Sequence, residues 1–251
     1  MKSHSKYLLL LLLLPLMMAC KDFFNDIFND KSTVYHVDIA TVKNPTLSSK
    51  FFFVLDNNQI MQITQTDLPS FVPKDGQRII ANYSILSKVD STNVPVKLFD
   101  ASSVLTKGIF KITPATQDSI GNDSVFVRDM WIGNDFLNVE FSYWGFNRTH
   151  FINMVSDASK VFTDGKTHLE FRHNGNGDTP TYLLRGIVSF NLKSLQAGVT
   201  GNSLNLVIHV KVPYKTAVQM YDVTYNFGPT TSTVYTGPQL SGFMKDLPSM
   251  H

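Results

Sequence analysis

Apolar and polar residues alternate with a period of two from Val34 onward, and no long apolar stripe recurs at helical spacing. This pattern is typical of half-buried β-strands, whose successive side chains point to opposite faces. Within residues 78–88, for example, Ile79, Ala81 and Tyr83 share one face. The first predicted strands cover residues 35–42, 50–55, 59–64, 78–88 and 94–99. Five such strands, joined by loops rich in Asn, Asp, Gly and Pro, predict a small β-barrel.

A second group of strands follows the polar stretch 113–123, which is rich in loop-forming residues. In one of these strands Leu206 and Ile208 share a face. The predicted strands cover residues 124–132, 136–143, 150–155, 168–173, 182–192, 203–212 and 220–225. Seven alternating strands predict an antiparallel β-sandwich. The sequence therefore predicts an all-β protein, with the barrel over residues 34–113 and the sandwich over residues 114–251.

The first residues have the layout of a bacterial lipoprotein signal peptide. Lys2 and Lys6 form a basic start, a run of leucines follows, and the small Ala19 precedes Cys20. The apolar run is too short to cross a bilayer. Cys20 is the only cysteine in the sequence, and we expect it to carry the lipid. The alternative is an ordinary secretory signal that is cut nearby and leaves a free thiol. We predict a signal peptide over residues 1–19.

Residues 20–33 are expected to tether the lipid to the barrel. Phe23, Phe24, Ile27 and Phe28 recur there at helical spacing among acidic and amide side chains. The segment is too short to be helical alone, so it is either a plain spacer or two helical turns that dock on the folded body. Its acidic character resembles the residues that direct some lipoproteins of gut and oral anaerobes to the cell surface. We predict an outer-membrane lipoprotein on the periplasmic face or the cell surface, with its lipid in the membrane.

The charge balance argues against nucleic acid as a partner. The sequence has 22 basic and 20 acidic residues, and removal of a leader that holds Lys2 and Lys6 leaves a formally neutral chain. Its basic residues are not clustered, whereas phosphate binding depends on clustered Lys and Arg. Because the sequence has one cysteine, no disulfide forms within the chain and burial of apolar surface must stabilise the fold.

The motifs of common enzyme and metal sites are missing from the sequence. It contains no HExxH motif, no glycine-rich phosphate loop and no G-x-S-x-G elbow. His168 and His173 are five residues apart, so on one strand they point to opposite faces and cannot hold one metal ion. The run from Asn174 to Asp178 imitates the start of a calcium loop but has a single carboxylate, which favours a Gly-Asn hairpin turn. We predict no cofactor, no metal and no enzymatic activity, although a triad assembled from distant strands stays open.

One aromatic residue is a candidate for ligand contact. Trp144 shares strand parity with Glu140 and Ser142, so continued alternation points its indole outward, near Phe146 and Arg148. An exposed Trp beside polar groups is suited to stack on a sugar ring or to anchor a protein partner. The alternative is a bulge after Tyr143 that turns Trp144 inward. We therefore take Trp144 and Arg148 as possible contacts to an unknown protein or glycan ligand.

Several segments resemble those of NigD-like lipoproteins. Residues 50–60 (KFFFVLDNNQI) and 76–86 (GQRIIANYSIL) are similar to the N-terminal domain of that family. Residues 131–141 (WIGNDFLNVEF) and 182–192 (YLLRGIVSFNL) are similar to its C-terminal domain, and Cys20 matches its lipid site. The resemblance implies an OB-like barrel followed by a β-sandwich. It also implies a link to bacteriocin operons, for which an immunity role has been suggested, and it supplies no catalytic motif.

Taken with the residues, the resemblance favours a non-catalytic, lipid-anchored protein of the cell envelope. Its expected role is binding or interaction, and bacteriocin immunity is one form of that role. The alternatives are a surface glycan-binding accessory lipoprotein and a structural subunit of a surface assembly. An enzyme is the third class, and a buried cleft with a His or carboxylate of displaced pKa would favour it.

Overall fold

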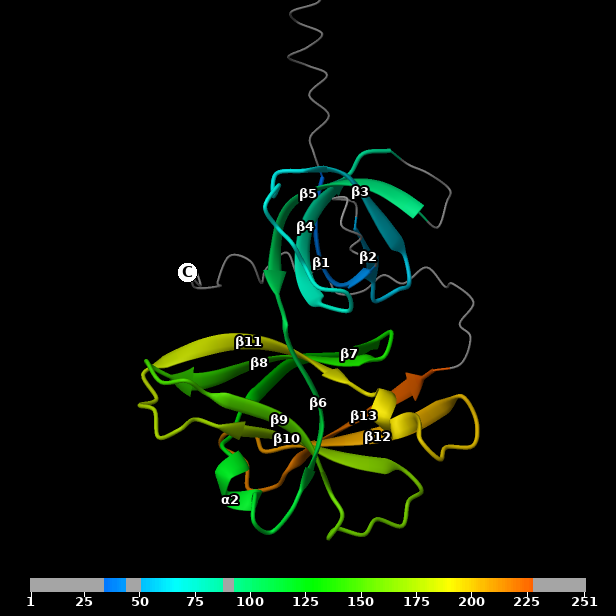
Figure 1. Ribbon diagram of the computed structural model, residues 1–251. Helices are drawn as coiled ribbons and strands as arrows, with labels where there is room; N and C mark the ends of the chain where they lie inside the picture. Colours follow the sequence, from blue (N-terminus) through cyan, green and yellow to red (C-terminus); the bar gives the residue numbers. More distant parts are fainter. Residues whose placement is uncertain (1–33, 44–50, 88–92, 228–251) are drawn as a thin grey trace, which may run out of the picture. The chain divides into compact units, whose positions relative to one another are not determined.

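The computed structural model describes residues 34–43, 51–87 and 93–227 (Figure 1). From His36 onward these residues belong to one compact unit. The predicted signal peptide, Cys20 and the whole of the predicted tether lie outside the described residues, so their assignments stay predictions.

The N-terminal part is a closed barrel with the strand order β1-β2-β3-β5-β4. Its strands are β1 (Tyr35–Lys43), β2 (Phe52–Leu55), β3 (Ile60–Thr66), β4 (Arg78–Ile85) and β5 (Asn93–Ser103). β3 and β5 pair in parallel, while the pairs β1–β2, β2–β3 and β4–β5 are antiparallel. Alternating side chains fill the barrel, and the fully buried ones include Val42, Phe53, Ile79 and Val96. The predicted small barrel is confirmed.

The C-terminal part is an eight-stranded sheet with the order β13-β12-β10-β9-β6-β11-β8-β7. Its strands are β6 (Leu105–Ile112), β7 (Phe126–Gly133), β8 (Phe136–Gly145), β9 (Phe151–Asp157), β10 (Thr167–Asn174), β11 (Tyr182–Asn191), β12 (Ser203–Val210) and β13 (Gln219–Asn226). Two short helical turns complete it, α2 (Gln117–Ile120) and η1 (Lys193–Gln196). The all-β prediction is confirmed, but the sandwich is not purely antiparallel. β6 pairs in parallel with both of its neighbours, and β10 pairs in parallel with β12.

The strand β6 links the two halves of the sheet and was not predicted. Its first half pairs with β11 up to Gly108, and its second half pairs with β9 from Ile109 (Figure 1). A strand that changes neighbours at such a point allows one continuous sheet to fold over itself as two packed layers. Most of its side chains are exposed or half-buried, which hides the alternating pattern. The chain therefore leaves the barrel near Val104, whereas the predicted boundary lies after residue 113.

A polar network joins the barrel to the sheet. Arg78 of β4 is fully buried, and its guanidinium donates hydrogen bonds to Asp56 (2.7 and 3.0 Å) and to Asn138 of β8 (2.9 Å). The indole N–H of Trp131 in β7 also donates to Asp56, at 3.1 Å. Because an unpaired buried charge is very unfavourable, this network specifies one arrangement of the charged side chains. Beside it, Ile39, Ile80 and Val104 form a small apolar cluster against Trp131 and Ile187.

Candidate binding surface

Trp144 lies on the outer face of the sheet. The pairing of β8 with β11 runs in one register from Phe136 to Gly145, and it places Trp144 opposite Leu183. Trp144 is 41% exposed and Leu183 48% exposed. The alternation therefore continues through Tyr143 and the indole points outward, while the inward alternative is wrong. A role of Trp144 in ligand contact stays a prediction.

An open groove of about 570 Å³ lies next to this pair of side chains. It is lined by Phe126, Val127, Arg128, Glu140, Ser142, Leu183 and Arg185. The Glu140 carboxylate lies between two guanidinium groups: Arg185 donates to it at 2.5 Å, and Arg128 Nε lies 3.5 Å away. Arg128 also donates to the Ser142 hydroxyl at 3.4 Å. The groove thus has a charged, hydrogen-bonding floor.

A β-bulge places Arg128 in the groove. In the pairing of β7 with β8, Val127 opposes Phe141 and Asp129 opposes Glu140, so Arg128 is the extra residue between them. Bulges rotate a side chain away from its regular direction and are common next to functional sites. This position was missed in the sequence analysis because a register shift has no signature in an alternating pattern.

The loop that follows β8 begins at Phe146, and hydrogen bonds to Asp178 hold this loop in place. The carboxylate of Asp178 accepts hydrogen bonds from the backbone N–H of Phe146 (2.6 Å) and of Asn147 (3.3 Å), and it lies 3.0 Å from Nε2 of His150. These bonds, chiefly that from Phe146, hold the pKa of Asp178 well below its usual range. Arg148 donates to the backbone carbonyl of Asn176 at 3.0 Å. Arg148 is therefore a loop-fixing residue in this structure, and it does not line the groove.

The predicted turn at residues 174–178 is present, with positive φ at Asn176 and Gly177. It is not a hairpin, because β10 pairs with β9 and β12 and β11 pairs with β6 and β8. Its carboxylate, Asp178, binds the neighbouring loop instead of completing a calcium loop. Among the described residues, no group of three or more His, Cys, Asp or Glu side chains is arranged to hold a metal ion.

His168 and His173 lie in separate clusters, in agreement with the prediction that they point to opposite faces. Nε2 of His173 is 2.8 Å from Nδ1 of His150, and the two rings are stacked. Nδ1 of His168 is 2.7 Å from Nε2 of His209. Burial, with the nearby His150, lowers the pKa of His173 to about 4. Each histidine is thus a hydrogen-bonded member of a pair.

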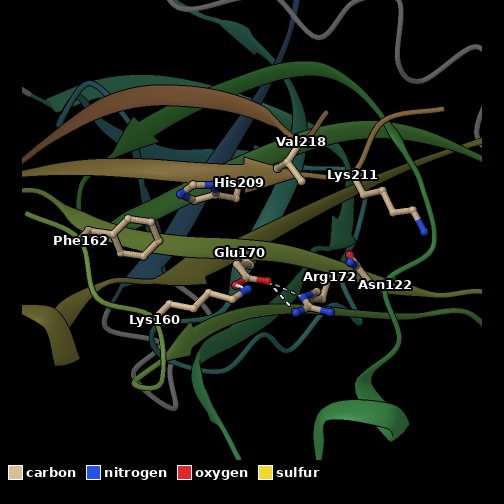
Figure 2. A pocket seen from close by; sticks show the side chains of 8 residues that line it. All are labelled: Asn122, Lys160, Phe162, Glu170, Arg172, His209, Lys211 and Val218. Carbon is tan, nitrogen blue, oxygen red and sulfur yellow. Dashed lines mark hydrogen bonds and ion pairs between the residues drawn. The ribbon is translucent and has the colours of Figure 1, made fainter. Parts of the chain in front are cut away.

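A second, smaller pocket of about 120 Å³ lies over β10 and β12 (Figure 2). Glu170 is at its centre, where it accepts a hydrogen bond from Arg172 at 2.7 Å and forms an ion pair with Lys160. Arg172 also donates to the backbone carbonyl of Gly121. Lys211 extends away from this cluster (Figure 2). This pocket of about 120 Å³ is much smaller than the groove of about 570 Å³ beside Trp144, so the groove is the better candidate for a binding site.

Two family models cover most of the described chain. Residues 39–104 match the NigD-like N-terminal OB domain, and residues 108–225 match the NigD-like C-terminal beta sandwich domain. The chain belongs to the NigD-like family. This confirms the family and the two domain types expected from the sequence. The family is not named for an enzymatic activity.

Solved structures with the same fold agree with this membership. A putative toxin related protein from Parabacteroides distasonis ATCC 8503 is 30% identical, with a TM-score of 0.67 over 78% of this chain and 95% of that chain. A protein of unknown function from Bacteroides vulgatus ATCC 8482 is 29% identical, with a TM-score of 0.63 over 87% of this chain and 96% of that chain. A NigD-like immunity protein from Bacteroides caccae ATCC 43185 is 21% identical, with a TM-score of 0.62 over 76% of this chain and 96% of that chain.

No curated protein matches the chain. Within residues 34–43, 51–87 and 93–227, none of the helices has the length and apolar character needed to cross a membrane.

Proposed function

We propose that this NigD-like protein is a non-catalytic, lipid-anchored protein of the outer membrane that acts by binding a partner. The anchor is supported by the sequence, in which the lone cysteine, Cys20, directly follows a leader with a basic start and an apolar run. More than one acyl chain holds a protein stably in a membrane, because each buried methylene contributes about 0.8 kcal/mol.

The binding role rests on one observation: the exposed pair of Trp144 and Leu183 beside an open, charged groove. Large apolar side chains held outward at a fixed loop are suited to contact a partner. In this groove the Glu140 carboxylate is bonded to Arg185 and Arg128, and the Ser142 hydroxyl contacts Arg128 rather than a base. This arrangement favours recognition over catalysis.

Bacteriocin immunity is the form of this function that the family name supports. A protein with the same fold is described as a NigD-like immunity protein, and another as toxin related. In this form the partner is a protein toxin, and the surface around Trp144 is the part that we expect to contact it.

Acylation and fractionation test the anchor. Cells that express the wild-type protein are grown with an alkyne-tagged fatty acid, and the protein is expected to carry the tag and to sediment with the outer membrane. Cys20→Ala is expected to lose both properties. Trp144→Ala, which leaves the leader intact, is the matched control and should behave as wild type. Equal tagging and membrane retention of the Cys20→Ala protein would overturn the proposed anchor.

A further inference from the structure

We propose that the paired His168 and His209 form an acid-sensitive switch, which holds the loop between β9 and β10 (residues 158–166) on the sheet at neutral pH and releases it in mild acid. This inference goes beyond the binding role proposed above and does not depend on the lipid anchor. Three features support it: the contacts that hold the loop on His168, the hydrogen bond between the two rings, and the place of the loop between two hollows of the surface.

His168 holds the β9–β10 loop through two of its residues. The ring of Phe162 is stacked on the ring of His168, with the centroids 3.6 Å apart and the ring planes 2° apart. Both carboxylate oxygens of Asp164 lie 3.0 Å from Nε2 of His168. The loop also forms ion pairs through Lys160 and Lys166, but these side chains are partly exposed and such pairs contribute little. The position of the loop therefore depends mainly on the ring of His168.

The hydrogen bond between the two rings depends on their protonation. Nδ1 of His168 lies 2.7 Å from Nε2 of His209, and this bond exists only while one of the two nitrogens lacks a proton. In the neutral pair, Nε2 of His168 donates to Asp164 and Nδ1 accepts from His209. One added proton is accommodated, because the facing nitrogen of the other ring still accepts. A second added proton places N–H against N–H and brings two positive charges into contact, so the rings must separate.

The surroundings of the pair favour the first proton and oppose the second. The hydrogen bond from His168 lowers the pKa of Asp164, so this carboxylate stays ionised in mild acid and stabilises a charged His168. Burial, together with the nearby His168, lowers the pKa of His209 below its ordinary value of 6.5. The closed loop is therefore fully stable above pH 6.5 and loses stability as the pH falls below this value.

Charged side chains surround the pair on the loop and on the neighbouring strands. The acidic ones are Asp157 of β9, Asp164 of the loop, Glu170 of β10 and Asp222 of β13. The basic ones are Lys111 of β6, Lys160 and Lys166 of the loop, Arg172 of β10 and Lys211 of β12. Asp, Glu, Lys and Arg side chains ordinarily titrate outside the range from pH 5 to pH 7. The two histidines are therefore the groups that we expect to change charge here in mild acid.

The β9–β10 loop separates two hollows in the surface. Lys160 and Phe162 line both the pocket of about 120 Å³ over β10 and β12 (Figure 2) and a neighbouring hollow of about 450 Å³. His209 lines the first hollow and His168 lines the second, so the two rings meet where the loop divides them. Release of the loop would join the hollows. The switch therefore changes the size of an opening on this face of the sheet with pH.

Hydrogen exchange of the full-length protein in detergent micelles, at pH 7 and at pH 5, tests this inference. The rates for residues 158–166 are compared after correction for the intrinsic pH dependence of amide exchange. We expect the amide of Lys166, which donates to Asp164 in the closed loop, to lose protection by at least about tenfold at pH 5, while β9 and β10 keep theirs. Imidazole NMR on the same samples follows the protonation of each ring.

Three variants separate this switch from other effects of acid. His209→Gln keeps a side-chain amide that can donate to His168 but takes up no proton, so its loop is expected to stay protected at pH 5. His173→Gln, which removes the titration of the other histidine pair, is the matched control and should open in acid like the wild type. Phe162→Ala removes the stacked ring and should leave the loop less protected at both pH values.

The inference is wrong if the wild-type loop keeps its protection in acid, if His209→Gln opens as the wild type does, or if His173→Gln no longer opens. The NMR spectra of the wild-type rings give a test that needs no variant. Opening of the loop while His168 or His209 is still neutral would show that repulsion between the two rings is not the cause.

Discussion

At the scale of single residues, the contacts between Asp178, His150 and His173 determine where the protons lie. The ionised Asp178 can only accept, so Nε2 of His150 carries a proton and donates to it. Nδ1 of His150 and Nε2 of His173 are 2.8 Å apart and share one hydrogen bond. Nδ1 of His173 is left without a hydrogen-bond partner among the described residues. Asp123 and the Ser124 backbone favour a proton on His173, but burial outweighs them and keeps this ring neutral.

The neutral His173 predicts a dependence of stability on pH. Its pKa is lowered from 6.5 to about 4 in the folded protein, so between these values the unfolded chain takes up a proton that the folded chain excludes. Stability present above pH 6.5 is therefore lost as the pH falls towards 4, by at most about 3 kcal/mol. His173→Gln keeps an N–H for His150 but removes this titration. Its free energy of unfolding in urea should therefore vary less across this range.

The free energies of unfolding of wild type and His173→Gln should agree best near neutral pH, once any constant difference between the two proteins has been subtracted. The lowered pKa of His209 leaves a residual slope in both proteins. An identical pH dependence in the two would show that folding does not lower the pKa of His173.

At the scale of strands and loops, the sequence predicts those strands in which apolar and polar residues alternate. β8 and β12 are predicted closely because Leu137, Val139 and Phe141, and likewise Leu206 and Ile208, are buried on one face. The outward direction of Trp144 follows from the same parity. By contrast, β6 escapes prediction because most of its side chains are at least partly exposed.

The charged floor of the groove also escapes prediction, for a different reason. Glu140 and Arg185 are far apart in the sequence and meet only because β8 and β11 pair in one particular register. Arg128 joins them only because β7 bulges. Pairing partners and register shifts depend on the whole fold, so a single strand carries no signal for them.

The loop after β8 should lose its order when Asp178 is removed. Asp178→Ala takes away the acceptor of the Phe146 and Asn147 amides, and hydrogen bonds to a charged group contribute about 1.5–3 kcal/mol. We therefore expect these two amides to exchange with deuterium at least about tenfold faster. Asp164→Ala, which removes the acceptor of the Lys166 amide in another loop, is the control. Unchanged exchange at residues 146–147 in Asp178→Ala would contradict this role.

At the scale of the whole molecule, the barrel and the sheet share one buried charge pair. Asp56 from the barrel and Arg78 contact Asn138 and Trp131 of the sheet, and Gly133 lies directly against Asp56. A methyl group at Gly133 would overlap the Asp56 carboxylate, so no side chain can be accommodated there without displacing it. The two folded parts therefore stabilise each other through Asp56.

This coupling predicts cooperative unfolding. We expect the wild-type protein to unfold in a single thermal transition, in which circular dichroism and tryptophan fluorescence change together. Gly133→Ala should lower stability by at least about 2 kcal/mol and split the transition in two, because overpacking and a disturbed buried ion pair both act at this position. Gly108→Ala is the matched control, since a methyl group there meets no atom within 4 Å. A single, unshifted transition for Gly133→Ala would show that the junction contributes little.

The position of β6 also affects how the chain acquires its structure during synthesis. Each half of this strand needs a neighbour that the ribosome makes much later: Ile109 is paired with Met154, and Leu105 with Val188. The barrel has all its strands once Ser103 has been translated, so it is free to form first. The nascent sandwich must wait for β9 and then for β11, with the apolar side chains of β6 unprotected meanwhile. Such long-range parallel pairing folds slowly and is prone to aggregation, so this interval is the one in which a chaperone would be most effective.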